Sequence, residues 1–260
     1  MKITIFTDTH FGHSENTHKI LEKFYKKTND SERPDLIIHS GDWTSHNQDQ
    51  FQSALKQIRR CIPETRIIGI DGNHDFWNGK IVKSFDMYNG DRGITSLRKI
   101  ETSYDELVNL HKKIYKENDI DYLEDIDYLN INNIIFIGFN GWYNSAVPRV
   151  TNDSSWIDKR VMLKLWNKSR EKISNVLSTV EKFNPNEFKR VCITHFQPFT
   201  ENYAYIEHCA DPSLRKLLTE RFDYLILGHS HQRCDFIEND CRVLNTGSGY
   251  NNPKFVSIEI

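Results

Sequence analysis

The sequence predicts an α/β fold built on a largely parallel sheet, and three observations support this class. Short apolar runs rich in isoleucine alternate with amphipathic segments along the N-terminal part of the chain. Pro34 and Pro63 interrupt the amphipathic segments ahead of the next apolar runs. With 260 residues, of which 38% are hydrophobic, the chain can bury a sizeable core as one domain.

The N-terminal elements are expected to alternate strand and helix. In chain order, they are expected at residues 2–7, 17–28, 35–40, 49–61 and 66–71. The first helical segment carries Ile20, Leu21 and Phe24 on one face, which is the spacing of an amphipathic helix. This order of elements implies parallel strands joined by right-handed crossovers.

The pattern changes after residue 75. Residues 76–127 are polar, charged and irregular, with a helix expected near 103–117. We interpret this segment as an insertion into a single domain that spans residues 1–260. A strand, a loop, a long helix and five more strands are then expected at residues 131–139, 143–156, 157–182, 190–196, 224–230, 234–238, 241–247 and 254–260. The turn Glu238-Asn239-Asp240 suits a hairpin between two of the last strands.

Composition argues against several classes of protein. The net charge of −2 gives no support to a nucleic-acid clamp or an anionic membrane partner. Apolar runs stay well short of the roughly 20 residues that cross a bilayer, and the N-terminus MKITIFTDTH is unlike a signal peptide. We therefore expect a soluble, cytoplasmic protein. The five cysteines show no CxxC spacing, which argues against a disulfide framework and a structural zinc site.

Polar side chains gather where the predicted strands end. Five strands are followed by such residues, namely Asp8 and His10, then Asp42, then Asn73, His74 and Asp75, then His195, and finally His229 and His231. Ligands of open α/β sheets bind in the crevice beyond the carboxyl ends of the strands. Each of these short patterns alone also suits an ordinary turn or surface residue. Together they predict one site.

The chemistry of these side chains favours divalent metal ions. Carboxylate, imidazole and amide donors without a thiolate suit manganese, iron or zinc, and they argue against a structural zinc site. Seven of these residues, namely Asp8, His10, Asp42, Asn73, His195, His229 and His231, are ligand candidates, which is more than one ion usually takes from a protein. They suit two ions that share a bridging carboxylate.

The residues at the strand ends resemble the motifs of a known family. The matching stretches are Asp8-x-His10, Gly41-Asp42, Gly72-Asn73-His74-Asp75, His195 and Gly228-His229-Ser230-His231. In order, strand context and approximate spacing they resemble the five motifs of the calcineurin-like metallophosphoesterases. The Gly-Asn-His-Asp form is similar to the phosphodiesterase-like branch. The resemblance implies a β-sandwich of two mixed sheets flanked by helices.

The resemblance also implies a set of metal ligands. One ion is expected on Asp8, His10, Asp42 and His231, and the other on Asp42, Asn73, His195 and His229. Asp42 would bridge the two. Manganese is the first candidate for both ions, and iron, zinc, nickel and magnesium are alternatives.

A hydrolytic mechanism follows from two adjacent cations. A hydroxide that bridges them is expected to attack a phosphodiester or phosphomonoester. His74 is the candidate acid for the leaving group, with a purely structural role as the alternative. Asp75 could orient His74, or it could cap a helix or a turn.

The substrate is less well defined by the sequence. Protein phosphatases of this family carry further residues after Gly-Asp that are missing after Asp42, so a small or nucleotide-like phosphoester is preferred. Besides Asn73 and His74, the candidate substrate contacts are His13, Trp77, Trp142, Tyr143 and Arg149, although aromatic residues near strand ends often serve packing.

Two other functions stay open. The alternatives are a DNA or RNA nuclease of the same superfamily and a non-catalytic, protein-binding member. The oligomeric state is not defined by the sequence. Among the other histidines, His39 is expected in the core or next to the site, and His18, His46, His111 and His208 are expected at the surface.

Overall fold

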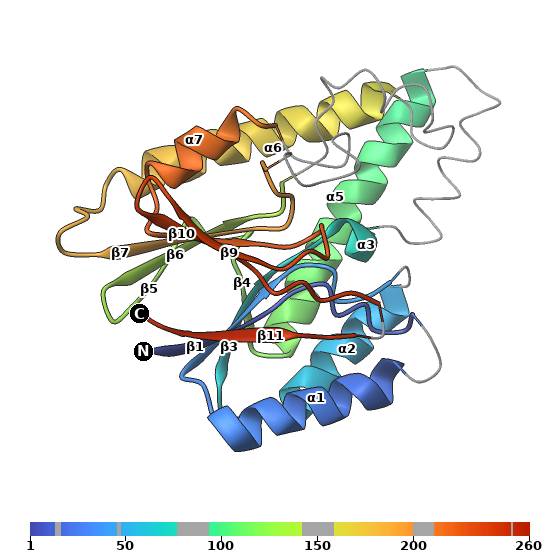
Figure 1. Ribbon diagram of the computed structural model, residues 1–260. Coiled ribbons are helices and arrows are strands. Elements are labelled where there is room, and N and C mark those ends of the chain that lie inside the picture. Colours follow the sequence, from blue (N-terminus) through green and yellow to red (C-terminus); the bar gives the residue numbers. More distant parts are fainter. Residues whose placement is uncertain (14–16, 46–47, 77–93, 142–158, 200–210, 251) are drawn as a thin grey trace.

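Two β-sheets face each other, and helices cover the outer face of each (Figure 1). The computed structural model describes residues 1–13, 17–45, 48–76, 94–141, 159–199, 211–250 and 252–260. Helices α1 (Thr17–Glu32) and α2 (Gln48–Cys61) lie below one sheet. Helices α6 (Lys159–Val180) and α7 (Leu214–Thr219) lie above the other. This arrangement confirms the predicted α/β sandwich of two mixed sheets flanked by helices.

The first sheet holds the predicted parallel strands. Its order is β11-β1-β2-β3-β4, and the strands are β1 (Lys2–Phe6), β2 (Leu36–Ser40), β3 (Arg66–Ile70), β4 (Ile120–Tyr122) and β11 (Phe255–Glu259). Strands β1 to β4 are parallel, whereas β11 pairs antiparallel with β1. The Met1 amino group donates to the Ile260 carbonyl at 2.7 Å, so the two ends of the chain lie side by side.

The second sheet is built from the C-terminal half of the chain. Its order is β5-β6-β7-β8-β10-β9, and the strands are β5 (Leu129–Ile131), β6 (Ile134–Phe139), β7 (Lys189–Thr194), β8 (Tyr224–Leu227), β9 (Cys234–Glu238) and β10 (Cys241–Asn245). The four central strands are parallel, and both edge strands are antiparallel. As predicted, Asn239 and Asp240 form the two-residue turn between β9 and β10.

Alternation along the strands separates three buried layers. On β2, Ile38 points between the sheets, whereas Ile37 faces α1 and α2. The layer between the sheets is almost entirely aliphatic, with Ile5, Ile68 and Ile193 fully buried. These layers hold the strand ends of the two sheets in fixed positions relative to each other.

Several elements were not predicted. Helix α5 (Ile94–Glu117) is longer than the expected 103–117, and the strand β4 that follows it joins the first sheet beside β3. The expected strand 131–139 is divided by a turn at Asn132 and Asn133, which have φ angles of 52° and 62°. The short helices α3 (Asn73–Phe76) and α7 were also missed. That the chain is one domain with an insertion near 76–127 stays a prediction.

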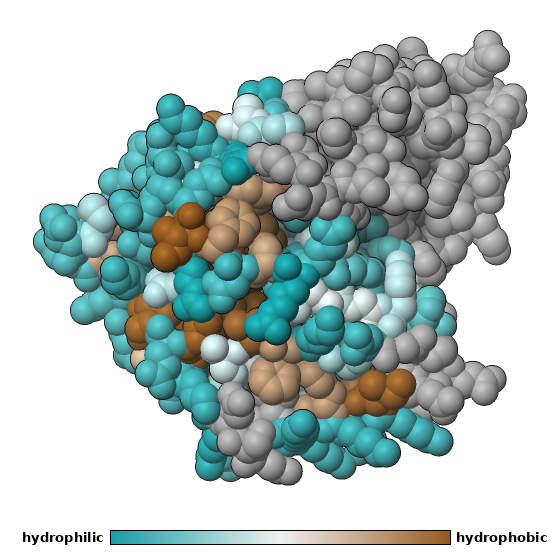
Figure 2. Space-filling model, in the orientation of Figure 1, coloured by the Kyte–Doolittle hydropathy of each residue, from teal (hydrophilic) through white to brown (hydrophobic). Residues whose placement is uncertain are grey.

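The surface of the described residues is mostly hydrophilic on the face shown in Figure 2. The larger exposed hydrophobic side chains of the described residues include Tyr128, Phe236, Ile237 and Tyr250. Within the described ranges, every helix is too short or too polar to cross a membrane.

Glu124, just after β4, holds a carboxyl group in a poorly hydrated position. Its Oε1 accepts a hydrogen bond from the Asn140 amide at 3.3 Å, and Lys172 Nζ lies 3.9 Å from its Oε2. Burial disfavours the charged form and raises the pKa of Glu124 from 4.5 to about 7. The fold is therefore more stable when Glu124 is neutral. This contribution to the free energy of unfolding is complete below about pH 4.5 and is lost as the pH rises through about 7.

We expect Glu124→Gln, which keeps the side chain neutral, to raise the free energy of unfolding at pH 8 by on the order of 2 kcal/mol. Below pH 4.5, where the wild-type carboxyl is also neutral, the gain should disappear. Urea unfolding of both proteins at pH 8 and pH 4.5 measures this difference. The matched control is Glu171→Gln, at an exposed position of α6. An equal effect of Glu124→Gln at both pH values would contradict the assignment.

Candidate metal centre

The structure brings the seven predicted metal ligands together at the carboxyl ends of five strands. They follow β1 (Asp8 and His10), β2 (Asp42), β3 (Asn73), β7 (His195) and β8 (His229 and His231). Two groups of side chains could each hold a metal ion. The first group is Asp8, His10, Asp42 and His231, the second is Asp42, His195 and His229, and within each group the ligand atoms lie within 4.8 Å of one another. Asp42 belongs to both.

The backbone at these positions is strained. Positive φ angles between 46° and 67° occur at Asp8, His10, Asp42, His229 and His231. Residues with a side chain seldom adopt this left-handed conformation, and where they do, they lie in turns or cluster at active sites. The loops support one another through backbone bonds, since the Asp8 amide donates to the Gly41 carbonyl at 3.0 Å and the His10 amide to the Asp42 carbonyl at 3.0 Å.

A glycine lets the loops after β2 and β3 approach closely. A side chain at Gly72 would collide with the carboxylate of Asp42. The glycines that precede the polar residues in the sequence therefore serve the close approach of the ligand loops.

In the first group, imidazole and carboxylate atoms converge. Nε2 of His10 lies 3.1 Å from Nε2 of His231 and 3.7 Å from Oδ2 of Asp42. Nε2 of His231 lies 3.5 Å from Oδ1 of Asp8. These four residues thus surround one small volume with two nitrogen and two oxygen donors.

In the second group, Asn73 adds an amide oxygen. Its Oδ1 lies 3.1 Å from Nε2 of His195 and 2.9 Å from Nδ1 of His229. Nε2 of His195 also lies 3.4 Å from Oδ2 of Asp42. Because Nδ1 of His195 donates to the Ser40 carbonyl at 2.8 Å, Nε2 is left to act as a ligand.

The Asp42 carboxylate connects the groups and supplies the test of whether metal ions fit. Its Oδ1 accepts the His74 amide at 2.9 Å, but its Oδ2 is buried and receives no hydrogen bond from the described residues. Such an orphaned oxygen costs free energy unless something else satisfies it. Because Oδ2 faces both groups of ligands, two divalent cations fit the residues present.

The charges of the site also favour the binding of cations. Burial opposes protonation of His195, but the charge of Asp42 outweighs it and raises the pKa of His195 to about 9. Likewise, burial opposes the charge of Asp42, but His195 and His74 lower the pKa of Asp42 well below its usual range. The carboxylates thus attract positive charge to the centre, and cations compete with protons for it.

The contacts of Asp75 agree better with the second of its two expected roles, capping a turn, than with orienting His74. Its buried carboxylate accepts hydrogen bonds from the amides of Gly72 at 2.8 Å and Thr44 at 2.9 Å. The His74 ring is held elsewhere, since its Nδ1 donates to the Ser45 carbonyl at 3.0 Å. Asp75 therefore ties the loop after β3 to the loop after β2.

A further buried carboxylate, that of Asp71, was not predicted. Its oxygens accept hydrogen bonds from the hydroxyls of Tyr115 at 3.0 Å and Tyr122 at 2.7 Å, and from Nδ1 of His111 at 2.9 Å. The expectation that His111 lies at the surface is wrong, because its side chain is fully buried and stacks on Phe51 at 4.1 Å. The carboxylate of Asp71, in the loop after β3, gives the buried imidazole of His111 a hydrogen-bond partner, which offsets the cost of burying that ring.

The remaining predicted residues have mixed outcomes. His39 is buried as expected and stacks on Trp43 at 3.6 Å. Burial lowers the pKa of His39 to about 3, so its ring is neutral. His13 is exposed, and its ring lies 4.3 Å from that of Tyr250. The described residues do not include Trp77, Trp142, Tyr143, Arg149, His46 and His208, nor the side chain of His18.

Tyr250 was missed, although the same reasoning could have found it. It lies beyond the carboxyl end of β10, which is parallel to β8. Its ring lies 4.2 Å from that of His10 and 5.1 Å from that of His231. The signal in the sequence was an aromatic residue that follows the carboxyl end of another strand in the same sheet.

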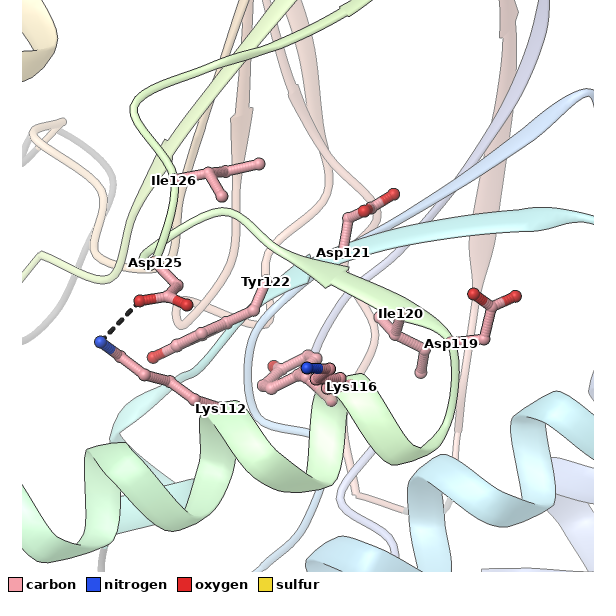
Figure 3. A pocket seen from close by; sticks show the side chains of 9 residues that line it. Lys112, Lys116, Asp119, Ile120, Asp121, Tyr122, Asp125 and Ile126 are labelled. Atoms are coloured by element: carbon pink, nitrogen blue, oxygen red, sulfur yellow. Dashed lines mark ion pairs between the residues drawn. The ribbon is translucent and has the colours of Figure 1, made fainter.

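A separate cavity lies beside α5 and β4 (Figure 3). It has a volume of about 270 Å³ and is lined by Lys112, Tyr115, Lys116, Asp119, Ile120, Asp121, Tyr122, Asp125 and Ile126. None of the candidate metal ligands lines it. An ion pair between Lys112 and Asp125, 2.6 Å long, satisfies two of its charged groups.

Comparisons with known proteins agree with this geometry. A family model described as calcineurin-like phosphoesterase matches residues 1–233. No curated protein matches the chain significantly.

Three solved structures share the fold at low sequence identity. A phosphopantetheinyl hydrolase from Mycobacterium tuberculosis is 15% identical with a TM-score of 0.64, and the alignment covers 96% of this chain and 90% of that one. A dimetal phosphatase from Danio rerio is 11% identical with a TM-score of 0.59, covering 99% and 91%. A putative 5'-nucleotidase from Staphylococcus aureus is 12% identical with a TM-score of 0.53, covering 100% of this chain and 51% of that one.

Proposed function

Because the chain belongs to the calcineurin-like phosphoesterase family, we propose that it hydrolyses phosphoric esters with two divalent cations that share Asp42. The observation that carries this proposal is the position of Asp42 Oδ2, which is buried, lacks a hydrogen-bond donor among the described residues and faces both ligand groups. A carboxylate that only stabilised the fold would be expected to have such donors.

The proposed ligands follow the two groups. One cation would be held by Asp8, His10, Asp42 and His231, and the other by Asp42, Asn73, His195 and His229. When bound, the two cations would activate a water molecule as the nucleophile and neutralise the phosphate oxygens. Manganese is our first candidate, because the ligand set combines oxygen and imidazole donors without a thiolate.

His74 is the proposed acid for the leaving group. Its amide donates to Asp42, and its ring lies 4.8 Å from the ring of His10, so it stands at the edge of the metal centre. Because Nδ1 donates to the Ser45 carbonyl, Nε2 is the nitrogen that can pass a proton to the leaving oxygen. Asp75 contributes by holding the loops that carry Asp42 and Asn73.

The proposed substrate is a phosphodiester or phosphomonoester with a small or nucleotide-like leaving group. The Gly72-Asn73-His74-Asp75 stretch favours the phosphodiesterase-like branch. The structural relatives named as a phosphopantetheinyl hydrolase and a dimetal phosphatase share the fold, and both names are consistent with phosphoester hydrolysis.

A substrate panel tests the proposal. We expect protein freed of metal by a chelator to lose at least about 99% of its activity, and manganese to restore it, because the cations provide the nucleophile. The panel contains bis-p-nitrophenyl phosphate, p-nitrophenyl phosphate, cyclic nucleotides and DNA. Preference for the first compound would identify a diesterase, whereas strongly salt-dependent DNA cleavage would identify the alternative nuclease. Full activity without metal, or no hydrolysis of any compound, would contradict the proposal.

A further inference from the structure

Tyr250 lies over the metal centre and is the feature that the proposed mechanism leaves unused. Its ring packs against His10 at 4.2 Å and His13 at 4.3 Å, with interplanar angles of 33° and 32°. Tyr250 is 38% exposed, so part of the residue is accessible from solvent. A tyrosine in this position can contact a molecule that enters the site.

The hydroxyl of Tyr250 reaches the proposed acid. It lies 3.3 Å from Nε2 of His74. Since Nδ1 of His74 already donates to the Ser45 carbonyl, a neutral ring accepts at Nε2, and the Tyr250 hydroxyl is the donor. The hydroxyl therefore stands beside the one nitrogen that can protonate a leaving group.

A buried loop fixes the position of Tyr250. Asn245 donates through Nδ2 to the Gly228 carbonyl at 3.0 Å and accepts the Gly247 amide through Oδ1 at 2.9 Å. Ser248 is fully buried, and its hydroxyl donates to the Lys254 carbonyl at 2.8 Å. Because Gly228 precedes the ligand His229, the loop that carries Tyr250 is bonded directly to the loop that carries the metal ligands.

Resting on the proposed function, we propose that Tyr250 is a catalytic residue whose hydroxyl donates, together with His74, to the leaving-group oxygen of the phosphoester. Two donors 3.3 Å apart can both lie about 2.8 Å from one oxygen atom. When the substrate arrives, the Tyr250 hydroxyl turns from Nε2 to the leaving oxygen. Tyr250 keeps its own proton. Once the hydroxyl has turned away, Nε2 of His74 takes up a proton from solvent and passes it to the leaving oxygen as the bond of that oxygen to phosphorus breaks, which returns His74 to its neutral form.

The dependence on the leaving group follows from this role. When the leaving group is poor, such as an alkoxide, its oxygen develops a localised negative charge that must be stabilised in the transition state. In p-nitrophenolate the ring already delocalises that charge, so the oxygen depends less on a hydrogen bond. A hydrogen bond made to that oxygen in the transition state raises kcat more than it lowers KM.

The test is Tyr250→Phe, which keeps the ring contacts with His10 and His13. We expect kcat to fall at least about tenfold for a phenyl or alkyl ester and less than about threefold for the p-nitrophenyl ester, with little change in KM. The substrates compared are all monoesters or all diesters, whichever class the wild type hydrolyses. Tyr128→Phe, an exposed tyrosine whose ring contacts Phe183, is the matched control and should behave as wild type. An equal loss with every leaving group, or none, would overturn the proposal.

A second measurement does not depend on catalysis. In the metal-free protein, we expect Tyr250→Phe to shift the nitrogen NMR resonance of His74 Nε2, because that atom loses its hydrogen bond, and to leave its Nδ1 resonance in place. Manganese affinity, measured by titration calorimetry, should stay within about twofold of wild type, because Tyr250 is not a ligand. If the wild type fails to hydrolyse phosphoesters, the proposed function fails, whereas an unchanged Nε2 resonance overturns the role of Tyr250 alone.

Discussion

Replacing Asp42 with asparagine is expected to lower kcat/KM for phosphoester hydrolysis at least about a thousandfold, even with manganese in excess. Oδ2 of Asp42 lies 3.7 Å from Nε2 of His10 and 3.4 Å from Nε2 of His195, so it is the atom that the two ligand groups share. In the variant, either a neutral amide oxygen or an amide NH₂ takes that place. The lost charge weakens both cation sites at once.

Titration calorimetry with manganese separates this explanation from misfolding. We expect two ions per chain in the wild type and at most one weakly bound ion in Asp42→Asn, with the fold retained by circular dichroism. The control is Asp235→Asn, because Asp235 is a carboxylate on β9 that is paired with Arg242 and partly exposed. Normal turnover and two bound ions in Asp42→Asn would refute the assignment of Asp42 as the shared ligand.

The positions of the candidate metal ligands were predictable because their signal is local. Each ligand follows an apolar strand directly, and the carboxyl ends of parallel strands meet at one edge of a sheet. Glycines mark where the chain must turn sharply, as at Gly41 with its φ of 94°, or pass close to another loop, as at Gly72. Within each sheet this rule places Asp8 near Asp42, and His195 near His229, whereas the meeting of the two sheets was expected only from the family resemblance.

The support around the centre was not predictable, because its signal is distant in the sequence. His111 and Tyr115 are four residues apart on α5, which places them on one helix face, but their partner Asp71 lies on another element. From the sequence alone, a histidine followed by Lys112 and Lys113 was assigned to solvent, although Leu107 and Ile114 belong to the buried face of the same helix. The extra strand β4 is only three residues long, too short to stand out from the irregular segment around it.

Removing the carboxylate of Asp71 is expected to have the largest effect on stability. Asp71→Ala leaves three buried donors, the hydroxyls of Tyr115 and Tyr122 and Nδ1 of His111, without their acceptor. We expect the free energy of unfolding to fall by about 3–5 kcal/mol, more than for the loss of a single hydrogen bond. Urea unfolding of the metal-free protein measures it.

Tyr122→Phe is the matched comparison, because it removes one of the three donors and leaves Oδ2 of Asp71 with Nδ1 of His111. Its expected cost is about 1–2 kcal/mol. If Asp71→Ala cost no more than Tyr122→Phe, the carboxylate would not be the centre of the network.

The network also bears on the metal centre, because Asp71 precedes Gly72 and Asn73 in the loop after β3 and its amide donates to Oδ1 of Asn140. A loop released from α5 and β4 should hold Asn73 less firmly, so Asp71→Ala should weaken the cation site of Asn73 and His195 more than that of His10 and His231.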